Sequence, residues 1–499
     1  MTKTGNPIKK LIGETAIYGL GTMLPRFLNL LLVPLYTIYV FTEAEYGEVT
    51  ILYSYVAILL VLLTYGMETA FFRYANKSND AKKVFNTATT SVLITAIIFL
   101  VIIFAFIDDI STLIEYPSNN EYVLIIAIII AIDAITALPF AYLRYQNKAI
   151  KFSLIRIISV VITISLNLIF LIAIPYYYGD SYNTLPVYRS TSLVTFVFIA
   201  NLTGSFSTLI MLSAEFKSFN FKIDVKLLRK MLKYGLPILL ISLSFMITEV
   251  VDKILLKYLL PDRAGADAQV GIYAASYKLA IIMMLFIQMF RYAAEPFFFS
   301  EAEKKDAKKT YSRVMTLFVA FTWFIFLMVT LYINVFKYII GEAFWAGLAI
   351  VPIILSAKIF LGIFYNLSVW YKLTNKTIYG ATIAIIAAIV TIVLNVLLIP
   401  KYGYMGSAWA NFASYFVIMV VSYLWGRKIY PINYELNKIL IYTVIAGVIY
   451  YISQYSFDFQ VFASYIYKTF LLLLYVILVY IIEKQSKNRL QKNNIANTL

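Results

Sequence analysis

Basic residues interrupt long apolar stretches of this sequence, and we select five of them as candidates: Arg26, Lys253, Lys278, Arg291 and Lys358. A cation near the middle of a bilayer costs at least about 2.5–3.5 kcal/mol on insertion scales, so such residues normally face a cavity. With Arg73, at the inner end of its stretch, they form a ladder of cations. A ladder of this kind suits a substrate with a fixed negative head, above all a pyrophosphate. We therefore predict that these six side chains bind the substrate.

Acidic residues in the same stretches are candidates for ion coupling or charge pairing: Glu68, Asp133, Glu249, Asp252 and Glu295. Each assignment has a structural alternative. Arg26 is also a candidate ion-pair partner of Glu68 or Asp133, and Lys253 has the helical i, i+4 spacing to Glu249. Arg291 and Glu295 share that spacing, and a structural pair is slightly favoured there. Asn167 and Asn395 fit interhelical hydrogen bonds better than a binding role.

Several function classes are excluded by composition. The chain has no cysteine and no histidine, which removes disulfides, thiolate metal sites and the commonest general base. No G-x4-G-K-[ST] phosphate loop is present. We expect no catalytic residue, no metal and no cofactor, apart from Na⁺ or H⁺ coupling through Glu68 or Asp133. The membrane potential alone is an alternative energy source.

The elements that must carry these charges are transmembrane helices. The 499 residues are 62% hydrophobic and 14% charged, with a mean hydropathy of +0.81, and apolar runs of about 20 residues recur throughout. We predict an all-α polytopic membrane protein with fourteen spans. They lie near residues 14–41, 49–74, 84–107, 121–145, 152–177, 188–212, 228–258, 269–298, 311–334, 346–371, 377–399, 404–426, 437–456 and 461–482.

The connections between these spans alternate in charge. Lysine and arginine gather in every second loop, as in Lys77–Lys83 and Lys304–Lys309, while the other loops are acidic. Basic loops stay in the cytoplasm, so both termini are predicted to be cytoplasmic. This distribution explains the net charge of +16 without a nucleic-acid partner.

Parts of the chain repeat. Residues 146–171 align with 374–399, with Asn147 opposite Asn375, and Gly47 aligns with Gly271. We infer a six-helix lobe at residues 1–212, a second at 213–432, and two extra helices with a tail at 433–499. Both lobes insert the same way up, which predicts a central cavity between them.

Four stretches resemble the Wzx-type polysaccharide flippases, which translocate lipid-linked oligosaccharides such as O-antigen units of lipopolysaccharide. They are YGMETAFFRYANK (65–77), VDKILLKYLL…VGIYAASYKLA (251–280), EPFFFSEAEKKDAKKTY (295–311) and LNVLLIPKYGYMGSAWANFASY (394–415). The superfamily also includes peptidoglycan-precursor flippases and multidrug and toxin extrusion antiporters.

The resemblance implies two six-helix lobes around a cationic cavity and no enzymatic activity. It implies alternating-access flipping of an undecaprenyl-pyrophosphate-linked oligosaccharide across the bacterial inner membrane, next to a glycan polymerase and glycosyltransferases. Cavity arginines of relatives on helices 1 and 8 correspond to Arg26 and Arg291. Asp252-Lys253 stands where the family tends to have Asp-Arg, and lysine lacks the planar fork. The alternative function is cation-coupled antiport of drugs or toxins.

Overall fold

The computed structural model describes residues 19, 21–78, 80–189, 191–217, 219–454 and 461–496. The first predicted span starts at residue 14, and its residues 14–18 and 20 lie outside this part. The chain forms two compact units, which we describe separately. Unit 1 is Met1–Ala274 with Asn395–Gly403, and unit 2 is Ala275–Leu394 with Tyr404–Leu499.

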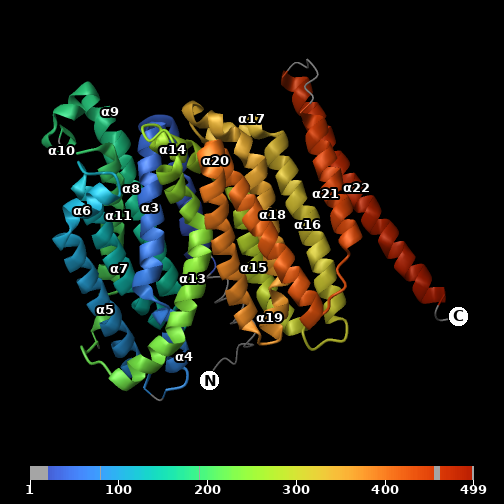
Figure 1. The fold of residues 1–499 in the computed structure, drawn as a ribbon, viewed down its shortest axis with the longest axis horizontal. Helices are drawn as coiled ribbons and strands as arrows, with labels where there is room; N and C mark the ends of the chain where they lie inside the picture. Colours follow the sequence, from blue (N-terminus) through green and yellow to red (C-terminus); the bar gives the residue numbers. More distant parts are fainter. Residues whose placement is uncertain are drawn as a thin grey trace, which may run out of the picture. The chain divides into compact units, whose positions relative to one another are not determined.

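Unit 1 is a bundle of helices (Figure 1). It begins with the helical stretch Gly21–Val40, which contains α2 (Leu32–Pro34) and the π-helical η1 (Leu35–Val40). The others are α3 (Glu43–Thr64), α4 (Met67–Ala75), α5 (Ala81–Ala105), α6 (Ile107–Leu113), α7 (Asn120–Tyr145), α8 (Ala149–Leu168), η2 (Ile169–Ala173), α9 (Ile174–Tyr178), η3 (Gly179–Thr184), α10 (Pro186–Arg189), α11 (Leu193–Met211), α12 (Ser213–Phe216), α13 (Val225–Leu259) and most of α14 (Ala266–Lys278).

Unit 2 is also helical. Its elements are α15 (Ile281–Glu301), α16 (Ala307–Leu331), α17 (Ile333–Phe336), η4 (Lys337–Ile339), η5 (Glu342–Ile350), α18 (Val351–Leu367), α19 (Val369–Leu373), most of α20 (Thr377–Ile429), α21 (Leu436–Ser453) and α22 (Val461–Ala496). Within this unit α16 packs against α15, α18, α21 and α22.

The predicted all-helical membrane fold is confirmed: the described residues contain no strand, and twelve of their helices are long and apolar enough to cross a membrane. One of these, α20, has 53 residues with Gly403 at φ 55° and ψ −138° inside it, so it is two helices joined at a kink. α13 is not among the twelve, but its 35 residues exceed the ~20 needed to span a bilayer. When α20 is counted as two spans and α13 is added, the twelve become the fourteen predicted spans.

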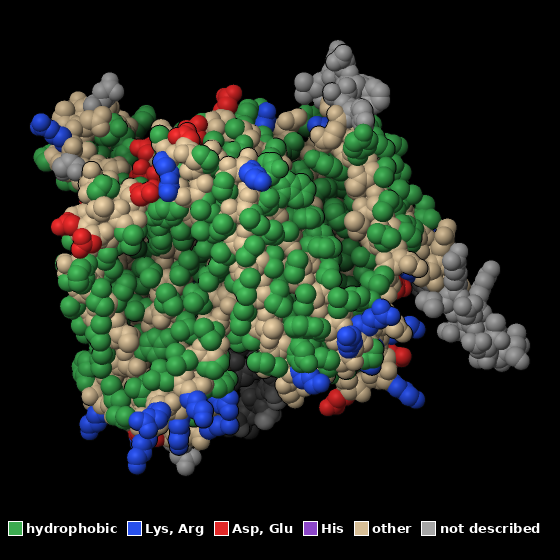
Figure 2. Space-filling model, in the orientation of Figure 1, with side chains coloured by type: hydrophobic (Ala, Val, Ile, Leu, Met, Phe, Trp, Pro, Cys, Tyr) green, Lys and Arg blue, Asp and Glu red, His purple; other side chains and the backbone are tan. Residues whose placement is uncertain are grey.

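Charge is distributed unevenly along unit 1. Figure 2 shows basic side chains at the end where α4 finishes and α13 begins, and acidic ones mainly at the opposite end. The basic residues of this end include Lys77, Lys82, Lys83, Lys226, Arg229 and Lys230. This is the charge separation expected of helices that end alternately in two aqueous compartments.

The two aligned copies share local geometry. Asn147 and Asn375 are both left-handed, at φ 55° and 57°, and each terminates a helix. In each case the next amide bonds a carbonyl five residues back, Lys148 N to Leu143 O at 2.9 Å and Lys376 N to Tyr371 O at 2.8 Å. These are matching Schellman-type C-caps. They support the interpretation of a duplication.

The aligned glycines meet at one helix crossing within unit 1. A Cβ on Gly47 would overlap the carbonyl oxygen of Asp267, and a Cβ on Gly271 would overlap that of Glu43. Since 43 and 267, like 47 and 271, are aligned positions, the contact between α3 and α14 is reciprocal. Close approach of two helix backbones requires glycine on both sides.

The predicted division of the chain at residue 212 follows the repeat and stays a prediction. The compact units follow packing instead: α13, which belongs to the second repeat, lies along α3 and α4 in unit 1.

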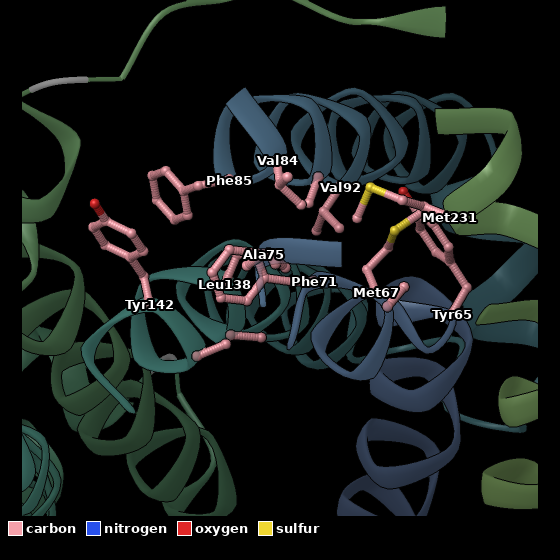
Figure 3. Close-up of a cluster of buried hydrophobic side chains, with 14 of the residues drawn as sticks. Tyr65, Met67, Phe71, Ala75, Val84, Phe85, Val92, Leu138, Tyr142 and Met231 are labelled. Atoms are coloured by element: carbon pink, nitrogen blue, oxygen red, sulfur yellow. The ribbon is translucent and has the colours of Figure 1, made fainter. Parts of the chain in front are cut away.

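Buried side chains position the basic end of unit 1. Phe71, Phe85 and Tyr142, from α4, α5 and α7, belong to one buried cluster, on the other side of which Met231 of α13 lies near Met67 (Figure 3). The rings of Phe85 and Tyr142 stack with centroids 4.7 Å apart. This core fixes α4 against the end of α7, and it thereby brings two charged side chains of these helices together.

Candidate functional site

The charged cluster of unit 1 begins with an ion pair between α4 and α7. Arg144 Nη2 donates to Glu68 Oε2 at 2.6 Å, and both side chains are part-exposed. About three turns before Arg144 on the same helix, Asp133 lies near Ser205 of α11. Arg156 of α8 interacts electrostatically with Glu68, Arg144, Asp133 and Arg26. We name these five residues, Arg26, Glu68, Asp133, Arg144 and Arg156, the arginine cluster.

Aromatic rings orient its two central arginines. The Arg156 guanidinium lies 4.5 Å from the ring centroid of Phe140 and 5.3 Å from that of Phe152. Arg144 lies 5.1 Å from the Phe72 ring. Rings on the faces of a guanidinium stabilise its charge and leave its in-plane N–H donors directed toward acceptors, in the fork that matches phosphate oxygens.

The cluster is open although it lies on spanning helices. Arg26 and Arg156 are exposed, and Glu68, Asp133 and Arg144 are intermediate. A charged side chain on a spanning helix faces water or a polar ligand rather than hydrocarbon. Three arginines against two carboxylates leave a net positive charge. The arrangement can therefore bind an anion.

Sequence reasoning did not select Arg144 and Arg156, although both lie inside predicted spans, 121–145 and 152–177. The sequence does carry a signal for both arginines, because each interrupts an apolar run as Arg26 does. Arg144 and Arg156 become candidates for binding because they lie near Glu68 and Asp133. Those two carboxylates are distant from them in sequence, so the sequence does not show this proximity. Glu68 was one of two alternative partners considered for Arg26, and in the structure it accepts a hydrogen bond from Arg144.

Asp252 and Lys253 form a second, enclosed group in unit 1. The Lys253 ammonium lies 2.8 Å from Asp252 Oδ1 and donates to the Glu249 carbonyl at 3.0 Å. Tyr273 donates to Asp252 Oδ2 at 2.7 Å. Asp252 is 0% exposed and Lys253 is 9% exposed. Lys253 therefore neutralises a buried carboxylate.

The next turn of α13 carries a similar group that the sequence analysis did not consider. Lys257 is buried, with its ammonium 3.4 Å from Asp267 Oδ1 and 3.4 Å from the centroid of the Tyr116 ring. Tyr116 donates to the same carboxylate oxygen at 3.2 Å. At the opposite, basic end of the unit, Arg73 stacks on Tyr234 at 4.1 Å.

Unit 2 contains the remaining predicted cations. Lys358 of α18 is 0% exposed; it donates to the Tyr415 hydroxyl at 3.3 Å and lies 5.0 Å from the Tyr277 ring. Lys278 is exposed at the end of α14. The Arg291 guanidinium lies 5.0 Å from the Tyr365 ring. Glu295 bonds Lys372 at 2.9 Å, so the charge partner of this glutamate comes from α19.

The predicted ladder is thus divided. Arg26, Arg73 and Lys253 belong to unit 1, and Lys278, Arg291 and Lys358 belong to unit 2. The structure brings Arg26 together with Glu68 and Asp133 in one electrostatic cluster. The binding roles of all these residues stay predictions. Asn167 has the interhelical role expected of it: its Oδ1 accepts from Tyr36 of η1 at 2.8 Å.

Solved structures share this fold. The "Lipid II flippase MurJ, inward closed conformation" matches with a TM-score of 0.72 at 15% identity, over 94% of this chain and 99% of that one. An outward-facing multidrug resistance MATE family transporter of the MOP superfamily matches with a TM-score of 0.60 at 14% identity, over 85% and 96%. Its inward-facing counterpart gives 0.57 at 15%, over 83% and 94%.

Among curated proteins, none matches this sequence. The family described as "Polysaccharide biosynthesis protein" matches residues 11–302, which is more than half of the chain. The matched range includes the whole arginine cluster. This chain is therefore a multi-pass membrane protein that belongs to the polysaccharide biosynthesis protein family and has the fold of the MurJ flippase and the MATE transporters.

Proposed function

We propose that this protein is a flippase that moves an undecaprenyl-pyrophosphate-linked oligosaccharide from the cytoplasmic to the outer leaflet of a bacterial inner membrane. The observation that carries the proposal is the arginine cluster. Arg26 of the first spanning helix, Arg144 of α7 and Arg156 of α8 form with Glu68 and Asp133 one group of electrostatically interacting charges in unit 1, and none of the five side chains is buried. The family and the MurJ-like fold support the same class of function.

The chemistry of the cluster suits a pyrophosphate. Such a group presents several anionic oxygens, and Arg26, Arg144 and Arg156 supply forked donors for them. In this structure Glu68 and Asp133 partly neutralise these donors. A bound pyrophosphate competes with Glu68 for Arg144, and uptake of a proton or Na⁺ at the released carboxylate would couple binding to an ion gradient.

Replacing Arg156 tests the proposal. Arg156→Gln removes a charge-assisted contact of about 1.5–3 kcal/mol, which is about tenfold to a hundredfold in affinity. We expect lipid-linked oligosaccharide to accumulate on the cytoplasmic leaflet of cells that depend on this variant, and Arg26→Ala to act likewise. The matched control is Arg229→Gln, an exposed arginine outside the cluster, which should transport normally. Full transport by both cluster variants would exclude the cluster as the substrate site.

The alternative is antiport of drugs or toxins, with which the MATE-like fold is compatible. This activity uses intramembrane carboxylates for cation exchange and has no need of arginines around an anion. Expression in a host without drug pumps separates the two functions. Drug resistance that Glu68→Gln abolishes and Arg156→Gln leaves intact would favour antiport over flipping.

The proposed function also implies an orientation in the membrane and a set of partner enzymes. Both termini would lie in the cytoplasm, where glycosyltransferases assemble the lipid-linked unit, and a glycan polymerase would take it up on the outer side. Lys278, Lys358, Arg291 and Arg73 would assist the substrate along its path. The chain would have no enzymatic activity of its own.

A further inference from the structure

The two aligned copies differ in one connection, which lies between α9 and α11 in the first copy. Both copies approach it with the same residues, Ile174-Pro175 and Tyr178-Gly179 in the first and Ile399-Pro400 and Tyr402-Gly403 in the second. The backbone dihedrals of the two glycines nearly agree, with φ 53° and ψ −143° for Gly179 and φ 55° and ψ −138° for Gly403. In the second copy the next helix follows Gly403 directly within α20, whereas residues 180–192 precede α11 in the first. The turn between the two helices therefore does not require these added residues.

The added residues extend a part of the chain that is rich in tyrosine. Residues 174–192, which we name the tyrosine segment, contain five tyrosines, and their only charged residues are Asp180 and Arg189. Tyr176 is 89% exposed and Tyr177 is 81% exposed. Exposed aromatic patches outside the hydrocarbon of a membrane mark binding surfaces.

Two other tyrosines hold the segment in place. The Tyr188 hydroxyl donates to the carbonyl of Phe170 in η2 at 2.7 Å, and the Tyr188 ring stacks on Phe196 of α11 with centroids 4.5 Å apart. The Tyr182 ring meets the Tyr188 ring edge-on at 5.6 Å. The segment is thus tied to both helices that it connects, so a ligand would lose little affinity to the ordering of this surface.

The exposed tyrosines lie past the hydrocarbon core of the membrane. The helical stretch Ala149–Tyr178 has 30 residues, so it is about 45 Å long, against a core of about 30 Å. It starts next to Lys148 at the basic end of unit 1, and α9 and α10 lie at the end away from α4 (Figure 1). Even with the average tilt of about 20°, Tyr176 and Tyr177 reach the outer edge of the headgroup layer. By the predicted orientation they face the outer aqueous side.

The chemistry of this surface fits a sugar. A tyrosine ring combines an apolar face with a polar hydroxyl tip, and a pyranose ring has the same combination, an apolar face of C–H groups and a rim of hydroxyls. One acidic and one basic residue give the tyrosine segment no net charge, and a phosphate requires cations. Its depth removes a lipid chain as the ligand. A neutral sugar ring remains as the ligand that matches both properties.

We propose that the tyrosine segment binds neutral sugar rings on the outer side of the membrane, by stacking on Tyr176 and Tyr177. The inference rests on the proposed function for the source of the sugar, because a translocated oligosaccharide would meet this surface as it leaves unit 1. The arginine cluster shares no residue with the tyrosine segment and would bind the other, anionic end of the same substrate.

The test is saturation-transfer NMR on the purified full-length protein in lipid nanodiscs. Maltoheptaose is the neutral probe, trigalacturonic acid is the acidic probe, and nanodiscs without protein are the blank. We expect saturation transfer to the C–H protons of maltoheptaose. We expect weaker transfer to trigalacturonic acid at equal concentration, because acidic side chains gather mainly at this end of unit 1 (Figure 2) and repel its carboxylates.

Variants make the test specific. Tyr176→Ala and Tyr177→Ala each remove one stacking ring, so maltoheptaose should bind each about twofold to tenfold more weakly. Tyr176→Phe keeps the ring, and its binding should stay within about twofold of that of the unmodified protein. The matched control is Tyr402→Ala: Tyr402 is 61% exposed and aligns with Tyr178, but no added residues follow it. This variant should bind maltoheptaose normally.

Three results would overturn the proposal. The first is no transfer from the unmodified protein to maltoheptaose above the blank. The second is undiminished binding by folded Tyr176→Ala and Tyr177→Ala variants, which would assign both tyrosines to the headgroup layer. The third is undiminished binding with lost transport in cells, which would assign the segment to a protein partner. Sugar binding is measured without transport, so accumulation of lipid-linked oligosaccharide in Arg156→Gln cells tests the proposed function separately.

Discussion

At the scale of single residues, most charged side chains on the spanning helices of unit 1 have a defined partner. Whether the pair is buried or exposed decides whether it can bind a ligand. The carboxylate of Asp252 is enclosed, with one oxygen bonded to Lys253 and the other to Tyr273. Arg144 and Glu68 are part-exposed, so a ligand can replace either one as the other's partner. Burial thus separates charges that stabilise the fold from charges available for binding.

Asp252 provides a stability prediction. Asp252→Ala leaves the Lys253 ammonium buried without its carboxylate, and breaking a buried pair in this way costs about 3–5 kcal/mol. We expect thermal unfolding of the purified protein to occur at a clearly lower temperature. Asp262→Ala, in an exposed turn, should unfold like the unmodified protein. Equal unfolding temperatures for the two variants would contradict the structural role of Asp252.

At the scale of elements, local chemistry set several helix ends that hydropathy misplaced. The second span was predicted to start near residue 49, but α3 starts at Glu43 because Thr42 and Glu45 form a reciprocal capping box, with Thr42 N donating to Glu45 Oε2 at 2.9 Å. The predicted single span 269–298 is two helices, α14 and α15, separated at Leu279–Ala280. Hydropathy does not detect such a break, since the residues on both sides are apolar.

The reciprocal crossing of α3 and α14 yields a prediction about helix packing. Gly47→Ala or Gly271→Ala places a methyl group against a backbone carbonyl, which cannot rotate away, and we expect a loss of about 1–3 kcal/mol in stability. Gly447→Ala is the matched control, because its Cβ would meet nothing within 4 Å. That variant should be unchanged or slightly more stable.

Combining the two substitutions sharpens the test. Both methyl groups open the same contact, so the double variant should lose less than the sum of the single losses. If the losses of stability measured by thermal unfolding were strictly additive, the two glycines would act independently. That result would contradict a shared crossing.

At the scale of the whole molecule, the two units differ in how accessible their predicted binding cations are. Arg156 in unit 1 is exposed, and Lys358 in unit 2 is 0% exposed. If both contact an anion during transport, then the surroundings of Lys358 must rearrange. The conformation described here would thus present only part of the path to water.

Cysteine labelling measures this difference, because the chain has no cysteine of its own. In the resting protein, Arg156→Cys should react with a water-soluble thiol reagent and Lys358→Cys should not. Lys77→Cys, on the exposed end of α4, is the positive control. Rapid labelling at position 358 without substrate would show that unit 2 is open where the structure has it closed.

Much of this protein was determined by its sequence alone. Apolar runs, basic loops and the repeated Asn-Lys turns are local patterns, and each depends on residues within a few turns of one another. Spanning helices, the repeat that aligns Asn147 with Asn375, and the presence of intramembrane cations could therefore be predicted. The family resemblance rested on such local stretches as well.

Only the tertiary structure decided which charges meet. Glu68 and Arg144 are 76 residues apart, and Glu295 and Lys372 are 77 residues apart, so no periodic pattern in the sequence relates these partners. The sequence around a helical residue indicates which face of the helix the residue occupies. Its partner depends on which helices pack together and on how far each is displaced along its axis relative to the other. That choice is made by the packing of the whole bundle, as at the crossing of Gly47 with Gly271.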